Sequence, residues 1–373
     1  MFSMLLPIWT GVQNKPGFHL MPFSLNIKRG LVHQVLDDST RVAITERYGS
    51  SDYHFITTPP GLSTWGSRLG DFYFEKLIST IKDLTGKTIL EIGAGTLYIA
   101  KRVLDELHAS SYIACDPALR ADNNDARIEI CYDYFHYNRF QNYNIDAVLL
   151  INLLEHIVEP ETFLSEIRQL IELGNGFIYV VVPDCERGMK VGDIGICLHE
   201  HISYFTRSSL QLTMEAAGLE IDWLLQHEDT LFAMAHANLH MSRSNTLPEI
   251  DILDTFQLHV EENLKFAEKV LKEAGETGQQ WALHGCSVGL NNILALLNLT
   301  SSPHLYLFDG DEAKVGKYLP AFDRPIMHAN DPFYKSMMGA IIAAPTYFEQ
   351  IREYVIETHN LPQRSIRSLL PIV

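Results

Sequence analysis

The sequence predicts an α/β protein with two doubly wound sheets and a small N-terminal region, and two observations carry this prediction. Apolar, strand-like segments at residues 88–92 and 281–284 each run into a glycine turn that opens into a helical pattern. Further apolar runs follow at residues 145–152 and 305–309. Parallel strands that are buried on both faces give runs of this kind. A chain of 373 residues is long enough for two or three packed domains.

Residues 1–65 differ from the rest of the chain and are expected to form a small lid or substrate-binding region that is partly β-structured. Its apolar stretches at residues 18–23 and 30–36 are short, and prolines interrupt the region. From residue 61 to 85 the apolar positions have helical spacing, and Gly86 is expected to mark the end of that helix.

The turn after the first strand has the sequence Gly93-Ala94-Gly95 and follows the acidic Glu91. Glycine has no side chain and tolerates unusual dihedral angles, so this turn lets the backbone approach a nucleotide-like ligand closely. A second strand is expected at residues 111–115, with Asp116 at its tip. A carboxylate about twenty residues beyond a glycine turn accepts hydrogen bonds from ribose hydroxyls in doubly wound sheets. Asp116 is therefore expected to bind a ribose.

The remaining elements follow in sequence order. We expect a strand at residues 176–183 and a helix at 208–217, followed by a closing pair of strands at 219–225 and 230–239. A polar linker and a long helix at about 250–274 come next. These elements divide the chain into four regions: a lid at 1–65, a sheet domain at 66–240, a linker at 241–250 and a C-terminal domain at 251–373.

The second glycine turn, from Gly285 to Gly289, precedes a helical pattern that ends near residue 297 and a strand at 305–309. Two interpretations are open for this C-terminal module: a second nucleotide site, or a scaffold that reuses a stable βαβ unit. We favour the scaffold, because a shared fold does not by itself establish a site.

Composition limits the partners of the chain. Its 29 basic and 46 acidic residues give a formal net charge of -17, which disfavours nucleic acids and anionic membrane surfaces. No apolar run approaches the ~20 residues that span a bilayer, and residues 1–7 lack the basic start of a signal peptide. The five cysteines form no CxxC pair, which favours free thiols in a reducing compartment. We therefore expect a cytoplasmic protein with a small-molecule substrate.

The segment His199-Glu200-His201 is the richest in titratable groups and supplies the candidate catalytic residues. Histidine can take and return a proton near neutral pH, and an adjacent carboxylate can orient or stabilise an imidazole. A metal site is a weaker interpretation, because His-x-His needs a further ligand and the chain lacks the helical His-Glu-x-x-His spacing. A polar surface loop is the third alternative.

The spacing of Glu91, Asp116 and Asp146, with a strand that closes on Val182-Pro183-Asp184, resembles the class I methyltransferases that use S-adenosylmethionine. A dinucleotide dehydrogenase usually has a third glycine where this chain has Tyr98. The resemblance implies a Rossmann-like sheet with S-adenosylmethionine as its cofactor. It also implies cofactor-binding residues at the strand ends and in the glycine turn, namely Glu91, Gly93, Ala94, Gly95, Asp116, Pro117, Asp133 and Asn152.

A narrower resemblance comes from residues 199–206, between the strand that ends at Asp184 and Ala217-Gly218-Leu219. This order is similar to the sugar C-methyltransferases, which act on nucleotide-linked keto-deoxysugars. The C-terminal segments that match the same family are residues 285–291, 309–311 and 314–320, and the likeness covers most of residues 60–345. The resemblance implies catalytic roles for Glu200, His201 and His156.

Three departures from this pattern bear on function. The chain has no cysteine before Cys115, whereas members of the sugar C-methyltransferase family usually have an N-terminal zinc-binding subdomain, so we expect no metal. Leu198 stands where a catalytic tyrosine is common. A second tyrosine expected in the N-terminal region has its counterpart only in Tyr53-His54-Phe55. Separately, Leu97 stands where many class I methyltransferases have glycine.

The resemblance implies that a methyl group is transferred to a carbon next to a ketone, through an enolate. His201, assisted by Glu200, would remove the proton, while His156 or a nearby donor would stabilise the enolate oxygen. Two alternatives stay open: an O- or N-methyltransferase that acts on another small molecule, and a noncatalytic scaffold or binding relative.

Overall fold

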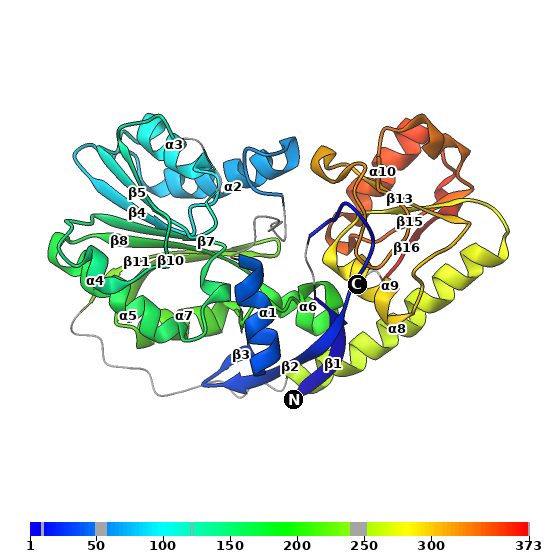
Figure 1. The fold of residues 1–373 in the computed structure, drawn as a ribbon, viewed down its shortest axis with the longest axis horizontal. Helices are drawn as coiled ribbons and strands as arrows, with labels where there is room; N and C mark the ends of the chain where they lie inside the picture. Colours follow the sequence, from blue (N-terminus) through cyan, green and yellow to red (C-terminus); the bar gives the residue numbers. More distant parts are fainter. Residues whose placement is uncertain (9–10, 49–57, 120, 122, 239–251, 372–373) are drawn as a thin grey trace.

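The computed structural model describes the chain except residues 9–10, 49–57, 120, 122, 239–251 and 372–373. The described strands form three sheets, of seven, five and four strands. The seven-stranded and five-stranded sheets lie at opposite ends of the molecule, and the N-terminal four-stranded sheet lies between and below them in the view of Figure 1. The expected linker at 241–250 and the expected tyrosine counterpart Tyr53 fall outside the described residues.

The seven-stranded sheet has the order β10-β11-β8-β7-β4-β5-β6. Its strands are β4 (Thr88–Ile92), β5 (Ser111–Cys115), β6 (Ile128–Cys131), β7 (Ala147–Ile151), β8 (Phe177–Pro183), β10 (Leu219–His227) and β11 (Thr230–Ala237). The five neighbouring strands β6, β5, β4, β7 and β8 are parallel, whereas β11 is antiparallel to both β8 and β10. The predicted doubly wound sheet with a closing antiparallel hairpin is confirmed.

Two apolar cores cover the two faces of this sheet. Helices α2 and α3 contribute to one core, and α5 and α7 contribute to the other (Figure 1). The helices of this part of the chain are α2 (Thr64–Thr80), α3 (Tyr98–Glu106), α4 (Tyr137–Phe140), α5 (Pro160–Ile171), α6 (Cys185–Val191) and α7 (Arg207–Ala216). A sheet covered on both faces explains why its parallel strands read as continuous apolar runs.

Helix α2 is shorter than the helix expected at residues 61–85. It begins after Ser63, whose hydroxyl accepts a hydrogen bond from the Gly66 backbone nitrogen at 3.0 Å, and it ends at Thr80. Beyond it, the Asp83 carboxylate accepts hydrogen bonds from the backbone nitrogen and the hydroxyl of Thr85, at 3.2 and 2.8 Å. Such local side-chain bonds offer the backbone an alternative to the helix, and they replace its last turn here.

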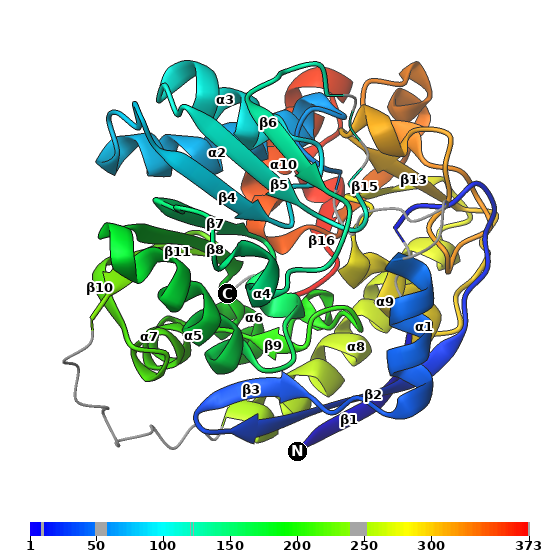
Figure 2. The ribbon, with the colours of Figure 1, turned by 60° about the vertical axis from the view of Figure 1, so that its left-hand side comes forward.

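The N-terminal sheet has the order β1-β2-β3-β9, and every pair in it is antiparallel. Its strands are β1 (Phe2–Pro7), β2 (Leu20–Lys28), β3 (Leu31–Gln34) and β9 (Ser203–Tyr204), and helix α1 (Asp38–Tyr48) follows β3. The expected β-structure of the region is therefore confirmed. Strand β9 comes from far along the chain, directly after the histidine segment. Figure 2 shows the first three strands beside the long helix α8 (Ile252–Glu276), against which their apolar side chains pack.

The C-terminal sheet has the order β14-β13-β12-β15-β16, and all of its strands are parallel. Its elements are β12 (Trp281–His284), α9 (Val288–Leu296), β13 (Leu305–Asp309), β14 (Met327–His328), β15 (Gly339–Ile342), α10 (Phe348–His359) and β16 (Ile366–Ser368). The predicted second Rossmann-like module is confirmed. None of the described helices is both long and apolar enough to cross a bilayer.

Candidate active site

The glycine turn after β4 has the open backbone that the sequence predicts. Gly93 and Gly95 have φ angles of 81° and 53°, and a Cβ added at Gly95 would meet no atom within 4 Å. The turn is therefore free to receive a ligand at Gly95. Leu97, the departure from glycine, also adopts the left-handed region, with φ of 62°, and its side chain is fully buried in the apolar core. Burial of this side chain offsets the strain of that backbone conformation.

Asp116 is fixed by backbone nitrogens at the tip of β5. Its Oδ2 accepts a hydrogen bond from Gly95 N at 2.8 Å, and its Oδ1 accepts one from Ala118 N at 2.7 Å. An ionised carboxylate has about four acceptor positions and can accept several hydrogen bonds at once, which is what the binding of ribose hydroxyls requires. The glycine turn is therefore joined by a hydrogen bond to Asp116, the residue that is predicted to bind a ribose.

The other predicted cofactor residues lie near the same edge of the sheet. Asn152 follows β7 with a positive φ of 51°. Asp133 and Pro117 are exposed and follow β6 and β5, and Ala94 is buried within the turn. Glu91 is different, because its carboxylate accepts a hydrogen bond from the Tyr112 hydroxyl at 2.7 Å and burial raises its pKa to about 8.

The histidine segment is held by β3 of the N-terminal sheet. The Gln34 backbone nitrogen donates to the Ile202 carbonyl at 2.8 Å. With its amide nitrogen turned toward the segment, the Gln34 side chain donates to the carbonyls of Leu198, His199 and His201 at 3.2, 3.2 and 2.9 Å. One buried glutamine therefore organises the backbone of the whole segment.

His156 and His201 come together beyond the carboxyl ends of β7 and β8. Their ring centroids lie 5.0 Å apart with an interplanar angle of 85°. The His156 Nδ1 donates to the Glu200 carbonyl at 2.8 Å, and the Ile202 backbone nitrogen donates to the Glu155 carbonyl at 2.7 Å. These two bonds join the turn after β7 to the histidine segment.

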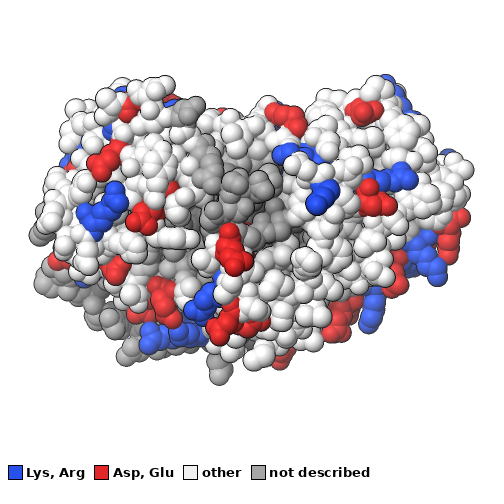
Figure 3. All heavy atoms as spheres, in the orientation of Figure 1, with Lys and Arg blue, Asp and Glu red and all other residues white. Residues whose placement is uncertain are grey.

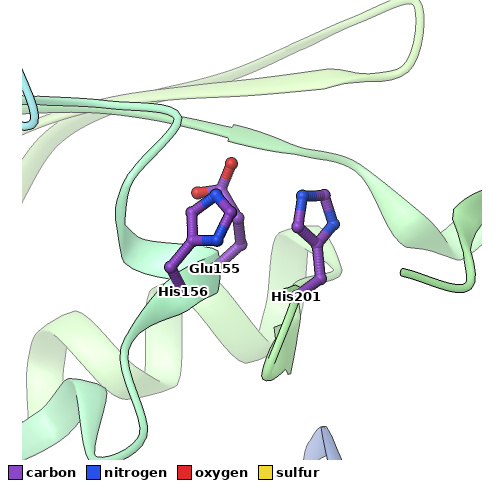
Figure 4. A group of neighbouring side chains, drawn as sticks. All are labelled: Glu155, His156 and His201. Carbon is purple, nitrogen blue, oxygen red and sulfur yellow. The ribbon is translucent and has the colours of Figure 1, made fainter. Parts of the chain in front are cut away.

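Three of the predicted catalytic residues, His156, Glu200 and His201, lie together in the structure, whereas His199 lies apart from them. Figure 4 shows His156 and His201 with Glu155, which sequence reasoning did not select. Glu200 is buried and contributes its carbonyl to this arrangement. His199 lies apart from the group, because its ring packs edge-on against Phe23 of β2 with centroids 5.4 Å apart.

Burial controls the protonation of this group. It lowers the pKa of His156 to about 4 and lowers the pKa of His201 well below 6.5. Burial also raises the pKa of Glu155 to about 8. Both imidazoles are therefore neutral at pH 7, and each neutral ring keeps one nitrogen that can accept a proton or a metal ion.

A cavity of about 190 Å³ opens beside His201. Its walls include Leu198, Asp184 at the end of β8, Asp229 in the β10–β11 turn and Thr346 of the C-terminal module. Across this boundary the Thr346 hydroxyl donates to the Asp229 carboxylate at 2.6 Å. Open α/β sheets bind their ligands at the carboxyl ends of the strands, which is where this cavity lies.

The C-terminal glycine turn differs from the first one, because its acidic residue is already engaged. Asp309 accepts hydrogen bonds from the backbone nitrogens of Cys286 and Asp311, each at 2.8 Å, and from Lys314 Nζ at 3.0 Å. Lys314 therefore forms an ion pair with the carboxylate that a ribose in a second nucleotide site would need. This geometry favours the scaffold interpretation over a second nucleotide site.

The surface charge is mixed on the face drawn in Figure 3, where acidic and basic side chains are interspersed. The excess of acidic residues therefore does not gather into one patch on that face. All five cysteines are buried free thiols, as the sequence predicted.

Sequence reasoning missed Glu155 and Gln34. Glu155 is adjacent to His156 in the segment Leu154-Glu155-His156-Ile157, so the sequence contained a signal that could have found it. Gln34 had no such signal, because its role depends on the pairing of β3 with β9.

Residues 68–223 match a family model described as "Methyltransferase domain". These residues include β4 to β8, the glycine turn and the histidine pair. Residues 68–223, which hold the five parallel strands of the seven-stranded sheet, therefore match a methyltransferase domain, for which the cofactor is S-adenosylmethionine. No curated protein sequence matches the chain.

Parts of the chain are also similar to solved structures. One of them is a chain from the complex between the Haloferax volcanii Trm112 methyltransferase activator and a putative methyltransferase. The two chains are 14% identical, the match covers 47% of this chain and 94% of that one, and the TM-score is 0.41. A putative S-adenosylmethionine-dependent methyltransferase from Listeria monocytogenes is 12% identical over 45% of this chain and 99% of that one, with a TM-score of 0.36. A riboflavin-analogue dimethyltransferase, RosA from Streptomyces davawensis, is 17% identical over 46% of this chain and 56% of that one, with a TM-score of 0.35.

Proposed function

Because residues 68–223 are a methyltransferase domain, we propose that this protein methylates a carbon next to a ketone in a nucleotide-linked deoxysugar or a related small molecule. The observation that carries the proposal is the pair of neutral imidazoles, His156 and His201, at the carboxyl edge of the sheet, with His201 in the wall of the cavity. Carbon becomes a nucleophile only after a proton is removed, so its methylation needs a base at this place.

Each predicted residue has a specific role in the proposal. His201 removes the proton next to the ketone, and Glu200 helps to orient it. His156 or a nearby donor stabilises the enolate oxygen. The Nδ1 proton of His156 is donated to the Glu200 carbonyl at 2.8 Å, so this ring serves as the donor when its Nε2 also carries a proton. The enolate carbon then attacks the sulfonium methyl group in line, and the rate depends mainly on the relative orientation of the two substrates.

The cofactor half of the proposal rests on the glycine turn and Asp116. The open space at Gly95 and the carboxylate fixed by Gly95 N provide a surface and an anchor for the nucleoside of S-adenosylmethionine. The predicted residues Glu91, Gly93, Ala94, Pro117, Asp133 and Asn152 are proposed to complete this site.

Methylation of oxygen or nitrogen is the second candidate function. Leu198 lines the cavity and offers no hydroxyl that could stabilise an enolate. An oxygen or nitrogen acceptor needs a base but no enolate stabilisation, so the same site suits that reaction too.

Exchange of the acceptor proton into deuterated buffer separates these functions. With S-adenosylhomocysteine bound and a keto-sugar nucleotide as the probe, carbon methylation predicts exchange next to the ketone, measured by proton NMR. His201→Asn and Glu200→Gln should slow exchange by about a hundredfold or more. His236→Gln, which changes a partly exposed histidine of the β10–β11 hairpin, is the matched control and should leave exchange unchanged. Exchange that is equally fast in His201→Asn would contradict the assignment of the base.

A further inference from the structure

Glu155, His156 and His201 form the group of three potential metal ligands that is found among the described residues. Each side chain offers one ligand atom, and these atoms all lie within 4.8 Å of one another. In Figure 4 the Glu155 carboxylate and the His156 ring rise from one turn, and His201 stands beside them from the neighbouring segment. The sequence had suggested only the weaker set of His199, Glu200 and His201.

We propose that these three side chains bind a divalent transition-metal ion, with zinc as the ion that fits best. Two imidazoles and one carboxylate are a ligand set that zinc accepts, usually with a fourth position left for water or substrate. Ligand atoms at about 2.1 Å from a zinc ion lie roughly 3.4 Å apart in a tetrahedron. Side-chain movements of about 1 Å would therefore bring the present group into coordination.

The hydrogen bond of His156 supports this proposal. Its Nδ1 donates to the Glu200 carbonyl at 2.8 Å, so the proton lies on Nδ1 and the lone pair lies on Nε2. Histidine ligands in metal sites commonly donate their second nitrogen to a carbonyl or carboxylate in this way, which fixes both tautomer and ring orientation.

The carboxylate of Glu155 provides independent support. Glu155 is 2% exposed, and its Oε2 has no hydrogen-bond partner within the part of the chain that the structure describes. Among the described ion pairs none involves Glu155. A buried carboxylate oxygen without a partner is costly, and a cation between Glu155 and the two imidazoles would supply that partner.

The fourth position of the ion would face the cavity, because His201 lines it. A bound ion would also occupy the lone pairs of His156 and His201. If His201 is the base of the proposed function, zinc and the acceptor proton compete for the same nitrogen. This last consequence rests on the proposed function, whereas binding of the ion does not.

Cobalt titration of the full-length, chelator-treated protein tests the proposal. We expect visible absorption bands of tetrahedral cobalt that saturate at one ion per chain and disappear when zinc is added. Glu155→Gln and His201→Asn should each weaken binding by at least about tenfold. His236→Gln is the control for surface binding, because its imidazole lies between Asp222 and Glu220 on the exposed hairpin, and it should leave the titration unchanged.

Calorimetry with S-adenosylhomocysteine verifies that each variant is folded, and it also separates this proposal from the proposed function. A wild-type protein that binds S-adenosylhomocysteine but not cobalt or zinc would overturn the metal site and leave the methyl-transfer proposal intact. Cobalt bands that persist in both Glu155→Gln and His201→Asn, or that vanish in His236→Gln, would overturn it as well.

Discussion

Asp116 shows how a single side chain can serve both the fold and the ligand. It receives the backbone nitrogens of Gly95 and Ala118, which fixes the turn after β4 against the tip of β5. The carboxylate that results is oriented before any ligand arrives, so little conformational freedom is lost on binding.

Asp116→Ala should therefore weaken binding of S-adenosylhomocysteine by about ten- to a hundredfold, because hydrogen bonds to a charged group are worth about 1.5–3 kcal/mol each. Titration calorimetry measures the change. Asp105→Ala, which removes an exposed carboxylate of α3, is the control and should bind as tightly as the wild type. Equal affinities for Asp116→Ala and Asp105→Ala would remove Asp116 from the cofactor site.

His284 in the C-terminal module is a buried histidine whose protonation affects stability. Burial lowers the pKa of His284 to about 4, from its ordinary value of about 6.5. The unfolded state therefore binds a proton at a higher pH than the folded state does, and the free energy of unfolding should fall as the pH drops from about 6.5 to about 4. The full effect is about 3 kcal/mol. The groups that face this ring are Tyr334, Tyr354, His359, Asp309 and Lys314.

Urea unfolding at several pH values tests this effect. His284→Gln should lose less stability than the wild type between pH 6.5 and pH 4. His227→Gln, at an exposed position, should keep the slope of the wild type. The idea fails if the wild type and His284→Gln lose stability in parallel.

At the scale of elements, the regular strands could be predicted from the sequence and the active segment could not. The strands at residues 111–115 and 305–309 have the predicted bounds, because parallel strands buried on both faces leave unmistakable apolar runs. Residues 197–202 have no such periodicity. Their path depends on the distant strand β3, whose Val32 and His33 pair with Tyr204 and Ser203. Sequence spacing therefore could not show that His201 lies beside His156 while His199 lies apart from that pair.

Gln34 is the element-scale test of this arrangement. Gln34→Ala removes the amide that donates to three carbonyls of the histidine segment and should lower the free energy of unfolding by about 1–3 kcal/mol. Turnover should fall as well, while affinity for S-adenosylhomocysteine stays unchanged. Gln257→Ala, on an exposed face of α8, should change stability by less than about 0.5 kcal/mol. Wild-type stability and turnover in Gln34→Ala would refute this role.

At the scale of the whole molecule, all three sheets meet at one segment. The N-terminal sheet holds residues 198–204 through Gln34 and β3. The C-terminal module holds the preceding residues, since Asn292 of α9 donates to the carbonyls of Ile194 and Cys197 at 3.1 and 3.3 Å. Asn263 of α8 donates to Val191 and Gly192 nearby. The C-terminal module therefore acts on the site as a support, which agrees with the engaged Asp309 of its own glycine turn.

Asn292→Ala tests this support from outside the methyltransferase domain. It should lower the free energy of unfolding by about 1–3 kcal/mol and reduce turnover, because the carbonyls of Ile194 and Cys197 lose the hydrogen bonds that the Asn292 amide donates. Affinity for S-adenosylhomocysteine should not change, since the Asn292 amide bonds the backbone at Ile194 and Cys197 and the cofactor site is proposed at the glycine turn and Asp116. Gln279→Ala, at an exposed position before β12, is the control. An Asn292→Ala protein with full turnover would show that the module does not support the site.

The position of the transferred methyl group tests the central claim most directly. The protein is incubated with S-adenosylmethionine carrying a 13C-labelled methyl group and with keto-sugar nucleotides, and the products are examined by carbon NMR. We predict a labelled methyl group bonded to the carbon next to the ketone, with loss of the proton from that carbon and no product from His201→Asn. A labelled methyl group on oxygen or nitrogen, or no transfer by a folded protein that binds S-adenosylhomocysteine, would contradict this account.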